Sequence, residues 1–170
     1  VEGLGNYEGT TNSEPDFTIT PKSIKKVDVE FVKSWDYTGE EIKPEVKVKD
    51  GGKVLVEGVD YKVKYENNVN AGEATITITG VGNFINSIEA TYTITAKELT
   101  NEMVTVDVAD EGVESTGSAI EPEVTVKDGD KVLVEGTDYT VEYTNNVAPG
   151  TATVTVKGIG NYKGLVEKTF

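Results

Sequence analysis

Apolar and polar residues alternate along most of this chain with a period of two positions. The alternation is clearest at residues 60–66, 73–79 and 88–95, and it recurs at 26–32 and 42–49. A period of two is that of a β-strand with one buried face, because successive side chains of a strand point to opposite sides. No segment keeps a helical period over about ten residues. The pattern therefore predicts an all-β chain of antiparallel strands, with no helix longer than one turn.

Turn signals separate the predicted strands. Asp50-Gly51-Gly52 predicts a tight hairpin, since glycine supplies the positive φ that such turns need. Asn67-Asn68 and Ala71-Gly72 mark the next turn. The residues predicted to be buried are Tyr61, Val63, Tyr65, Ile76, Ile78 and Tyr92, and those predicted to be exposed are Lys62, Lys64, Thr75 and Thr77. Two sheets of this kind, packed face to face, predict a β-sandwich.

The whole pattern occurs twice. Residues 53–83 return as residues 131–161, with an offset of 78 positions and no gap. Between Thr38–Phe84 and Thr116–Tyr162, roughly two thirds of the aligned positions are identical. Predicted outward positions change freely between the copies, whereas predicted inward positions change by a methylene or so, as a packed core requires. A repeat of this length indicates a module used in series.

The repeat divides the chain into two modules, residues 21–97 and 98–170, which we expect to lie end to end with few contacts between them. Their junction, Thr95–Thr100, has no Gly or Pro, so a flexible tether is not expected. The fold prediction is thus all-β, with two tandem Ig-like antiparallel β-sandwich modules.

Residues 1–20 match the end of a repeat and not its beginning. Gly3-Leu4-Gly5-Asn6-Tyr7 resembles residues 80–84 and 158–162, and Phe17-Thr18-Ile19-Thr20 resembles residues 92–95. We therefore expect this segment to be the C-terminal hairpin of a preceding repeat, and the sequence to be a piece of a longer chain. A two-stranded hairpin is marginal in water, so it is expected to pack on the first module or to pair with a neighbouring chain.

Composition limits the chemistry that this chain can perform. Its 170 residues include no Cys and no His, and its net charge is −14. It therefore has neither a thiolate ligand nor the commonest general base and metal ligand. The negative charge disfavours nucleic acid and anionic lipid, and no apolar run is long enough to span a bilayer. We expect a monomeric, non-enzymatic, exported protein with no cofactor, no metal, no catalytic residue, no nucleic-acid partner and no membrane insertion.

The best candidate for a ligand site is the pair Trp35 and Tyr37. Paired aromatic rings on a β-sandwich can stack on sugar rings, which would make this a carbohydrate-binding surface for a host or plant glycan. The competing interpretation is structural, with Tyr37 packed over the module end and Trp35 over an interdomain joint, since Trp and Tyr are commonly half-buried.

Three other motifs have structural interpretations beside functional ones. Asp60-Tyr61 and Asp138-Tyr139 stand at strand starts, where Tyr is expected to hydrogen-bond back to an upstream loop and Asp to cap the preceding turn. Asp128-Gly129-Asp130 could offer two carboxylates to calcium, but it also has the composition of a hairpin turn. The paired glycines at 80, 82, 158 and 160 precede strands, so no helix N-terminus is expected there to bind phosphate.

Several of these motifs together resemble a known family. They are Tyr37-Thr38-Gly39, Ile42 with Pro44, Asp60-Tyr61-x-Val63-x-Tyr65-x-Asn67-Asn68, Gly72-x-Ala74-Thr75 and Gly80-x-Gly82-Asn83-aromatic. The set resembles the Ig-like tandem repeats of large surface and secreted proteins of Gram-positive bacteria, and is similar to the YDG/MBG-type repeat domains. The resemblance implies an extracellular spacer or adhesin-stalk role and brings no catalytic residues with it. The sequence does not identify a partner, and the candidates are a host or plant glycan and a surface protein. The second copy departs from the first at its start, where Val113 and Ser115 stand in place of Trp35 and Tyr37.

Overall fold

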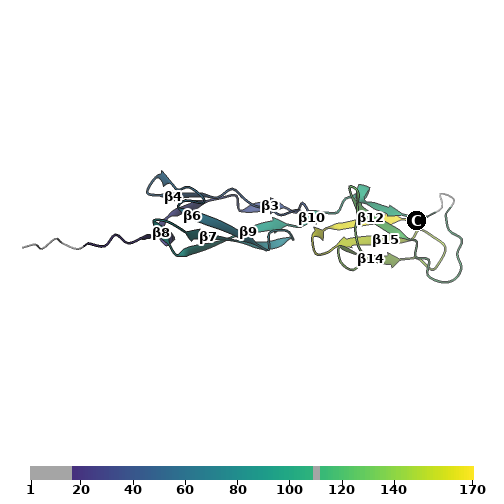
Figure 1. The fold of residues 1–170 in the computed structure, drawn as a ribbon. Helices are drawn as coiled ribbons and strands as arrows, with labels where there is room; N and C mark the ends of the chain where they lie inside the picture. The colour runs from purple at the N-terminus through teal and green to yellow at the C-terminus, as the bar shows by residue number, and fades with distance from the viewer. Residues whose placement is uncertain (1–16, 109–111) are drawn as a thin grey trace, which may run out of the picture.

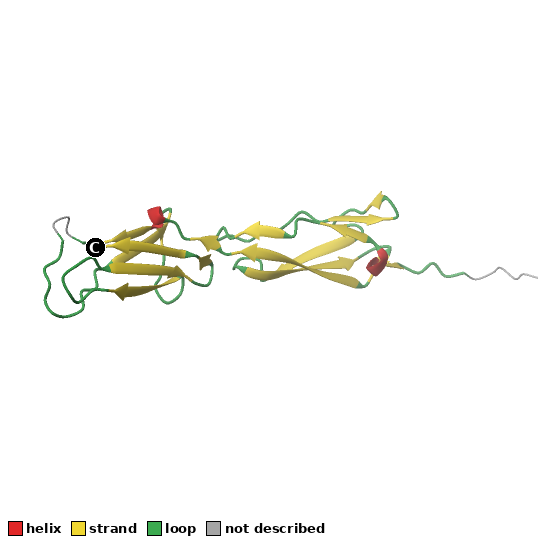
Figure 2. Cartoon of the chain, turned by 180° about the vertical axis from the view of Figure 1, so that it is seen from behind, coloured by secondary structure: helices red, strands yellow, loops and turns green. Residues whose placement is uncertain are grey.

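The computed structural model describes residues 17–108 and 112–170. It is 48% strand and, in the part of the chain that it describes, contains no helix of seven residues or more. Figure 2 shows strands and loops, with short 3-10 turns at Ile24–Lys26 and Asn101–Met103. The prediction of an all-β chain is confirmed. The expected hairpin of residues 1–20 falls mostly outside the described residues, and 17–20 are described without a strand.

The strands form two groups, which follow one another along a long axis (Figure 1). The first strand group contains β1 (Lys22–Ser23), β2 (Asp28–Glu30), β3 (Ser34–Asp36), β4 (Lys47–Asp50), β5 (Lys53–Val54), β6 (Tyr61–Glu66), β7 (Gly72–Gly80), β8 (Phe84–Ile85) and β9 (Ser87–Thr95), with the 3-10 turn η1 (Ile24–Lys26). The second strand group contains β10 (Lys97–Glu98), β11 (Val104–Val106), β12 (Val124–Asp128), β13 (Lys131–Val132), β14 (Tyr139–Thr144), β15 (Thr153–Gly158), β16 (Tyr162–Lys163) and β17 (Leu165–Thr169), with η2 (Asn101–Met103).

In the first strand group, the sheet order is β3-β9-β7-β6 in one sheet and β2-β4-β5 in another, with β1 paired to β8. β3 runs parallel to β9, with Trp35 opposite Ile94, and β7 runs antiparallel to β9, with Gly72 opposite the same Ile94. The last residues of β9 therefore lie between β3 and β7. The hairpin between β4 and β5 turns at Gly51 and Gly52, whose φ values are 57° and 91°, as predicted.

The second strand group repeats this plan with one difference. Its sheets are β14-β15-β17, β11-β12-β13 and the parallel pair β10-β16. Within residues 112–170 no strand corresponds to β3. β17 is the counterpart of the first part of β9.

The predicted alternation of burial is largely correct. Tyr61, Ile76, Ile78 and Tyr92 are buried, and Lys62 and Lys64 are exposed. Two details differ. Val63 and Tyr65 are only half-buried, although Tyr61 on the same edge strand β6 is buried. Thr75 and Thr77 are half-buried instead of exposed, because β7 is flanked by strands on both sides.

The first two predicted strands are shorter than the pattern suggested. Residues 26–32 contain only the three-residue β2, after the turn η1, and residues 42–49 form a ladder only from Lys47. Burial still alternates through Ile42, which is 6% exposed. Its carbonyl accepts hydrogen bonds from Tyr92 Oη at 2.6 Å and Asn68 Nδ2 at 3.3 Å. A side chain of the opposite sheet and one of the loop between β6 and β7 thus satisfy a carbonyl that makes no ladder there.

Candidate functional site

Trp35, the first residue of the predicted ligand pair, lies on β3 at the surface. Its side chain is 38% exposed, and its indole Nε1 donates a hydrogen bond to the carbonyl of Val32 at 3.2 Å. The Trp35 carbonyl accepts a bond from Thr95 Oγ1 at 2.9 Å. The indole is therefore held in place by its polar atom, with part of its ring open to solvent.

Tyr37, the second residue of the pair, is buried at the junction of the two strand groups. It is 8% exposed, and its backbone N–H donates to the Thr95 carbonyl at 2.9 Å. Its ring packs edge to face against Tyr162 of β16, with centroids 5.8 Å apart and an interplanar angle of 75°. Such an arrangement suits two aromatic quadrupoles. Tyr37 thus stabilises the contact between the groups and presents little ring surface to a sugar.

Lys131 adds a cation to this aromatic contact. Its Nζ lies 6.0 Å from the ring centroid of Tyr37 and 5.6 Å from that of Tyr162. Both distances are within the range of a cation–π interaction. Two residues of the second strand group therefore hold one ring of the first.

A polar contact completes the junction on the side of the loop before β7. Asn161 Oδ1 accepts a hydrogen bond from the backbone N–H of Ala71 at 2.8 Å, and Asn161 Nδ2 donates to Asn70 Oδ1 at 3.1 Å. The oxygen and the nitrogen of the Asn161 carboxamide thus each have a hydrogen-bond partner in the first strand group. The chemical effect of these contacts is positioning, because they fix the second group against the end of the first.

Tyr162 is also tied to the second strand group through its hydroxyl. The hydroxyl donates to Asp128 Oδ2 at 3.2 Å, and Lys97 Nζ lies 2.6 Å from Asp128 Oδ1. Burial is the main cause that raises the pKa of Tyr162 well above its usual range, followed by the charge of Asp128 and the bond to it. Tyr162 therefore stays protonated and acts here as a hydrogen-bond donor.

The repeated Asp-Tyr pairs take the structural roles that the sequence predicted. The hydroxyl of Tyr61 donates to the carbonyl of Val46 at 3.3 Å, and Asp60 Oδ2 accepts the backbone N–H of Val56 at 3.0 Å. In the second group, Asp138 accepts the N–H of Val134 at the same distance. These residues fix a loop against the sheet and are not free for chemistry.

The glycine pairs are required by close backbone packing. A Cβ on Gly80 would lie 2.9 Å from the backbone of Phe84 and Ile85, and one on Gly158 would lie 2.6 Å from the N atom of Lys163. No side chain other than hydrogen fits at these distances. Asp128 and Asp130 flank a turn between β12 and β13, and no group of three potential metal-ligating side chains is found within residues 17–108 and 112–170.

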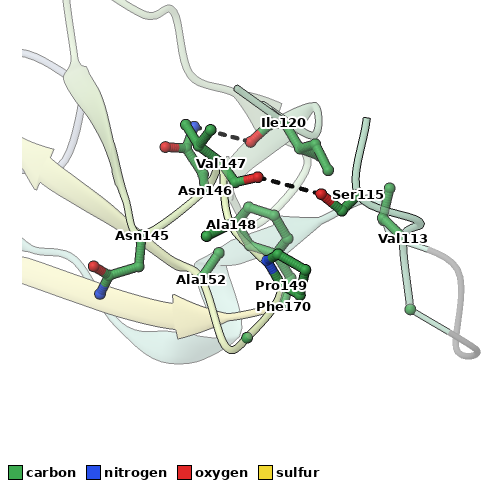
Figure 3. A pocket seen from close by; sticks show the side chains of 12 residues that line it. Val113, Ser115, Ile120, Asn145, Asn146, Val147, Ala148, Pro149, Ala152 and Phe170 are labelled. Atoms are coloured by element: carbon green, nitrogen blue, oxygen red, sulfur yellow. Dashed lines mark hydrogen bonds between the residues drawn. The ribbon is translucent and has the colours of Figure 1, made fainter. Parts of the chain in front are cut away.

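A pocket of about 230 Å³ opens at the end of the second strand group that lies away from the junction. Figure 3 shows Val113 and Ser115 on one side of it and the loop Asn145–Pro149 with Phe170 on the other. Ser115 Oγ donates to the Val147 carbonyl at 3.4 Å, and Asn146 Nδ2 donates to the Ile120 carbonyl at 3.1 Å. Its wall is mostly aliphatic and aromatic, so it suits an apolar side chain better than a charged ligand.

Sequence reasoning missed the junction residues Asn70, Lys131 and Asn161. The only available signal was the Gly-Asn-aromatic motif, which recurs at the end of each copy without showing what it touches. Their partners are up to 91 positions away in the chain, and such contacts leave no periodic pattern.

No helix in the described residues is long and apolar enough to cross a membrane.

Comparisons with known proteins do not place this chain in a family. No protein-family model, no curated protein and no solved structure matches the chain.

Proposed function

We propose that this chain is a structural repeat unit that acts as a spacer or stalk. It consists of two Ig-like antiparallel β-sandwich modules, residues 21–97 and 98–170, placed end to end. The motifs that resemble the tandem repeats of Gram-positive surface proteins support an extracellular location, on the cell surface or in a secreted protein. The proposal assigns no reaction and no cofactor to the chain.

Packing supports the sandwich arrangement of each module. In the first module, Val48 of one sheet and Ile76, Ile78 and Ile94 of the other are all almost fully buried. These residues belong to one connected hydrophobic cluster. Two sheets that bury their apolar faces against each other form a sandwich.

The observation that carries the stalk proposal is the junction. Only Ala96 separates β9 from β10, so the last strand of one module leads directly into the next. The hydrophobic cluster includes buried residues of both modules, with Tyr37 and Tyr162 at the junction. The junction has more contacts than the sequence led us to expect. A short linker with a packed, hydrogen-bonded contact limits bending, and therefore gives length with little flexibility.

Small-angle X-ray scattering tests this proposal. The wild-type chain should scatter as a stiff rod, whereas Tyr37→Ser should broaden the distribution of end-to-end distances, because it removes the ring that packs on Tyr162. Ile85→Ser is the matched control, since Ile85 is 44% exposed and lies at the opposite end of the first module. A compact particle for the wild type, or equal scattering from Tyr37→Ser and wild type, would contradict the proposal.

The alternative function is carbohydrate binding, and the exposed indole of Trp35 supports it. Because Tyr37 is buried, a sugar would stack on Trp35 without a second ring beside it. Tryptophan fluorescence measured against a wide set of soluble glycans tests this alternative, with Trp35 as the only indole of the chain. A saturable change with one glycan would support binding, and no change with any glycan would remove its only basis.

A further inference from the structure

The chain enters and leaves the first strand group at opposite ends, through two strands that run in the same direction. Where it enters, β1 pairs in parallel with β8, with Lys22 opposite Phe84. The entering segment, from β1 to β3, ends beside the last residues of β9, where β3 is parallel to β9 with Trp35 opposite Ile94. β9 then leads through Ala96 into the second strand group, along the long axis of Figure 1.

Tension on the two ends of this group acts on β3 and β9 in opposite directions. A pull on Pro21 draws β3 toward the start of the group, because β3 is the last strand of the entering segment. A pull on Ala96 draws β9 toward the second group. The hydrogen bonds between the two strands lie across this direction. They are therefore strained together and must break together, whereas a pull that separates two strand ends breaks such bonds one after another.

Hydrogen bonds join β3 to β9 at both ends of their contact. The N–H of Thr93 donates to the Lys33 carbonyl at 2.9 Å, and the N–H of Tyr37 donates to the Thr95 carbonyl at 2.9 Å. The hydroxyl of Thr95 adds a bond to the Trp35 carbonyl at 2.9 Å. A side chain of β9 thus reinforces the backbone ladder between the two strands.

Other contacts of the entering segment oppose sliding as well. Ile24 is 0% exposed, and β2 forms an antiparallel ladder with β4. Tyr37, next to the end of β3, is held by the ring of Tyr162 in the second group. If β3 slid toward the start of the group, Tyr37 would leave the junction and Ile24 would leave the core. Both movements expose apolar surface to water, which is unfavourable.

We propose that β3 and β9 form a mechanical clamp that resists tension along the chain. The clamp joins the segment through which the chain enters the first group directly to the strand through which it leaves. It adds resistance to forced unfolding to the stiffness of the stalk. The proposal rests on the stalk role for the source of the tension, but the clamp itself depends only on the geometry of β3 and β9.

Single-molecule force spectroscopy of the whole chain tests this geometry. The chain contains no Cys, so two introduced cysteines are the only attachment points. The pair Ile19→Cys and Lys97→Cys directs the pull along the strands, whereas Thr38→Cys and Lys97→Cys separates β3 from β9 at one end. All three positions are exposed. At equal pulling rate, the first pair should unfold the first group at about twice the force of the second pair or more, because the bonds are strained together.

A backbone change in the clamp provides a second measurement. Tyr37→Pro and Tyr37→Ser both remove the ring, but only proline also removes the N–H that bonds to Thr95. Pulled from positions 19 and 97, Tyr37→Pro should unfold at a lower force than Tyr37→Ser, since forced unfolding reports the unfolding rate. Circular dichroism checks that both variants fold.

Two results would overturn the clamp: equal forces in the two pulling directions, or equal forces for the two Tyr37 variants. Neither result would change the rod that small-angle scattering measures without tension. Failure of the clamp is therefore distinguishable from failure of the stalk proposal.

Discussion

The two strand groups have nearly the same sequence over most of their length, yet they differ at β3. In the first group, β9 continues to Thr95, and β3 forms a parallel pair with its last three residues. In the second group, residues 112–118 form no strand, although residues 112–114 occupy the place of β3. A strand needs a neighbour that satisfies its backbone groups. Ser34-Trp35-Asp36 forms β3 beside such a neighbour, whereas Gly112-Val113-Glu114 at the same places forms no strand.

The junction and the far end of the second group show the same contrast for side chains. Tyr37, Asn70 and Ala71 each contact the second group, whereas the corresponding Ser115, Ala148 and Pro149 surround a pocket. The core positions of the two groups change only slightly between the copies, for instance from Ile76 to Val154. Packing inside each group restricts which residue types can stand in the core, whereas residues at the ends are restricted only by the neighbours that they contact.

The largest effect is expected when a core position of the first group is emptied. Ile94→Ala should lower the free energy of unfolding by about 2–5 kcal/mol, because it leaves a cavity at a position that is 1% exposed. Urea unfolding followed by the fluorescence of Trp35 reports this group alone. Ile85→Ala, at a position 44% exposed, is the control and should cost under about 1 kcal/mol. Similar costs for the two variants would mean that Ile94 is not a core residue.

A smaller effect is expected from changes at Tyr92 and Phe170, the corresponding aromatic residues of the two groups. Tyr92→Phe should cost about 0.5–1.5 kcal/mol, since it removes the 2.6 Å hydrogen bond to Ile42, whose carbonyl keeps its bond from Asn68. Phe170→Tyr is the reciprocal change and should not destabilise the second group. Thermal unfolding followed by circular dichroism measures both. A destabilised Phe170→Tyr variant would show that the two ladder ends differ in more than a hydroxyl.

Alkaline pH should lower the free energy of unfolding, because the buried Tyr162 of the junction resists ionisation. Burial raises the pKa of Tyr162, and an unfolded tyrosine ionises near about pH 10. Above that pH the unfolded chain loses the proton first, so the stability present below pH 10 falls as pH rises.

Tyr162→Phe should therefore reduce the loss of stability between about pH 8 and pH 11. The first group already has Phe84 at the corresponding position, so the ring alone should pack there. Urea midpoints at the two pH values, compared with those of the wild type, measure this difference. Tyr61, Tyr139 and other tyrosines with raised pKa contribute equally to both chains, so an unchanged pH dependence would mean that Tyr162 is not responsible.

The smallest effect is expected on the outer face of β6. Lys64→Ala should change the free energy of unfolding by under about 0.5 kcal/mol, because its ion pair with Glu66, at 2.8 Å, is exposed on both sides. The second group has Glu142 and Thr144 at these positions and keeps the same strand. Urea unfolding followed by Trp35 fluorescence checks this value. A cost like that of Ile94→Ala would mean that the strand is shifted by one residue.

The sequence by itself determined the all-β class, most strands and the alternation of buried and exposed positions. These are local properties, because side chains of a strand point to opposite sides and the buried face must be apolar. Tyr61, Ile76 and Ile78 could thus be assigned to the core before their partners were known. The hairpin at Gly51 and the role of Asp60 were equally local, since each depends on residues that are close in the chain.

The tertiary structure alone decided the rest, including which residue of the candidate site is exposed and which is buried. Trp35 and Tyr37 are two positions apart, but one remains partly exposed while the other is buried by Tyr162, which lies far along the chain. The half-burial of Thr75, the lack of a strand at residues 112–114 and the pocket beside Phe170 also depend on which segments become neighbours. Contacts between distant residues are set by how the sheets and groups pack, and a period-two pattern contains no information about them.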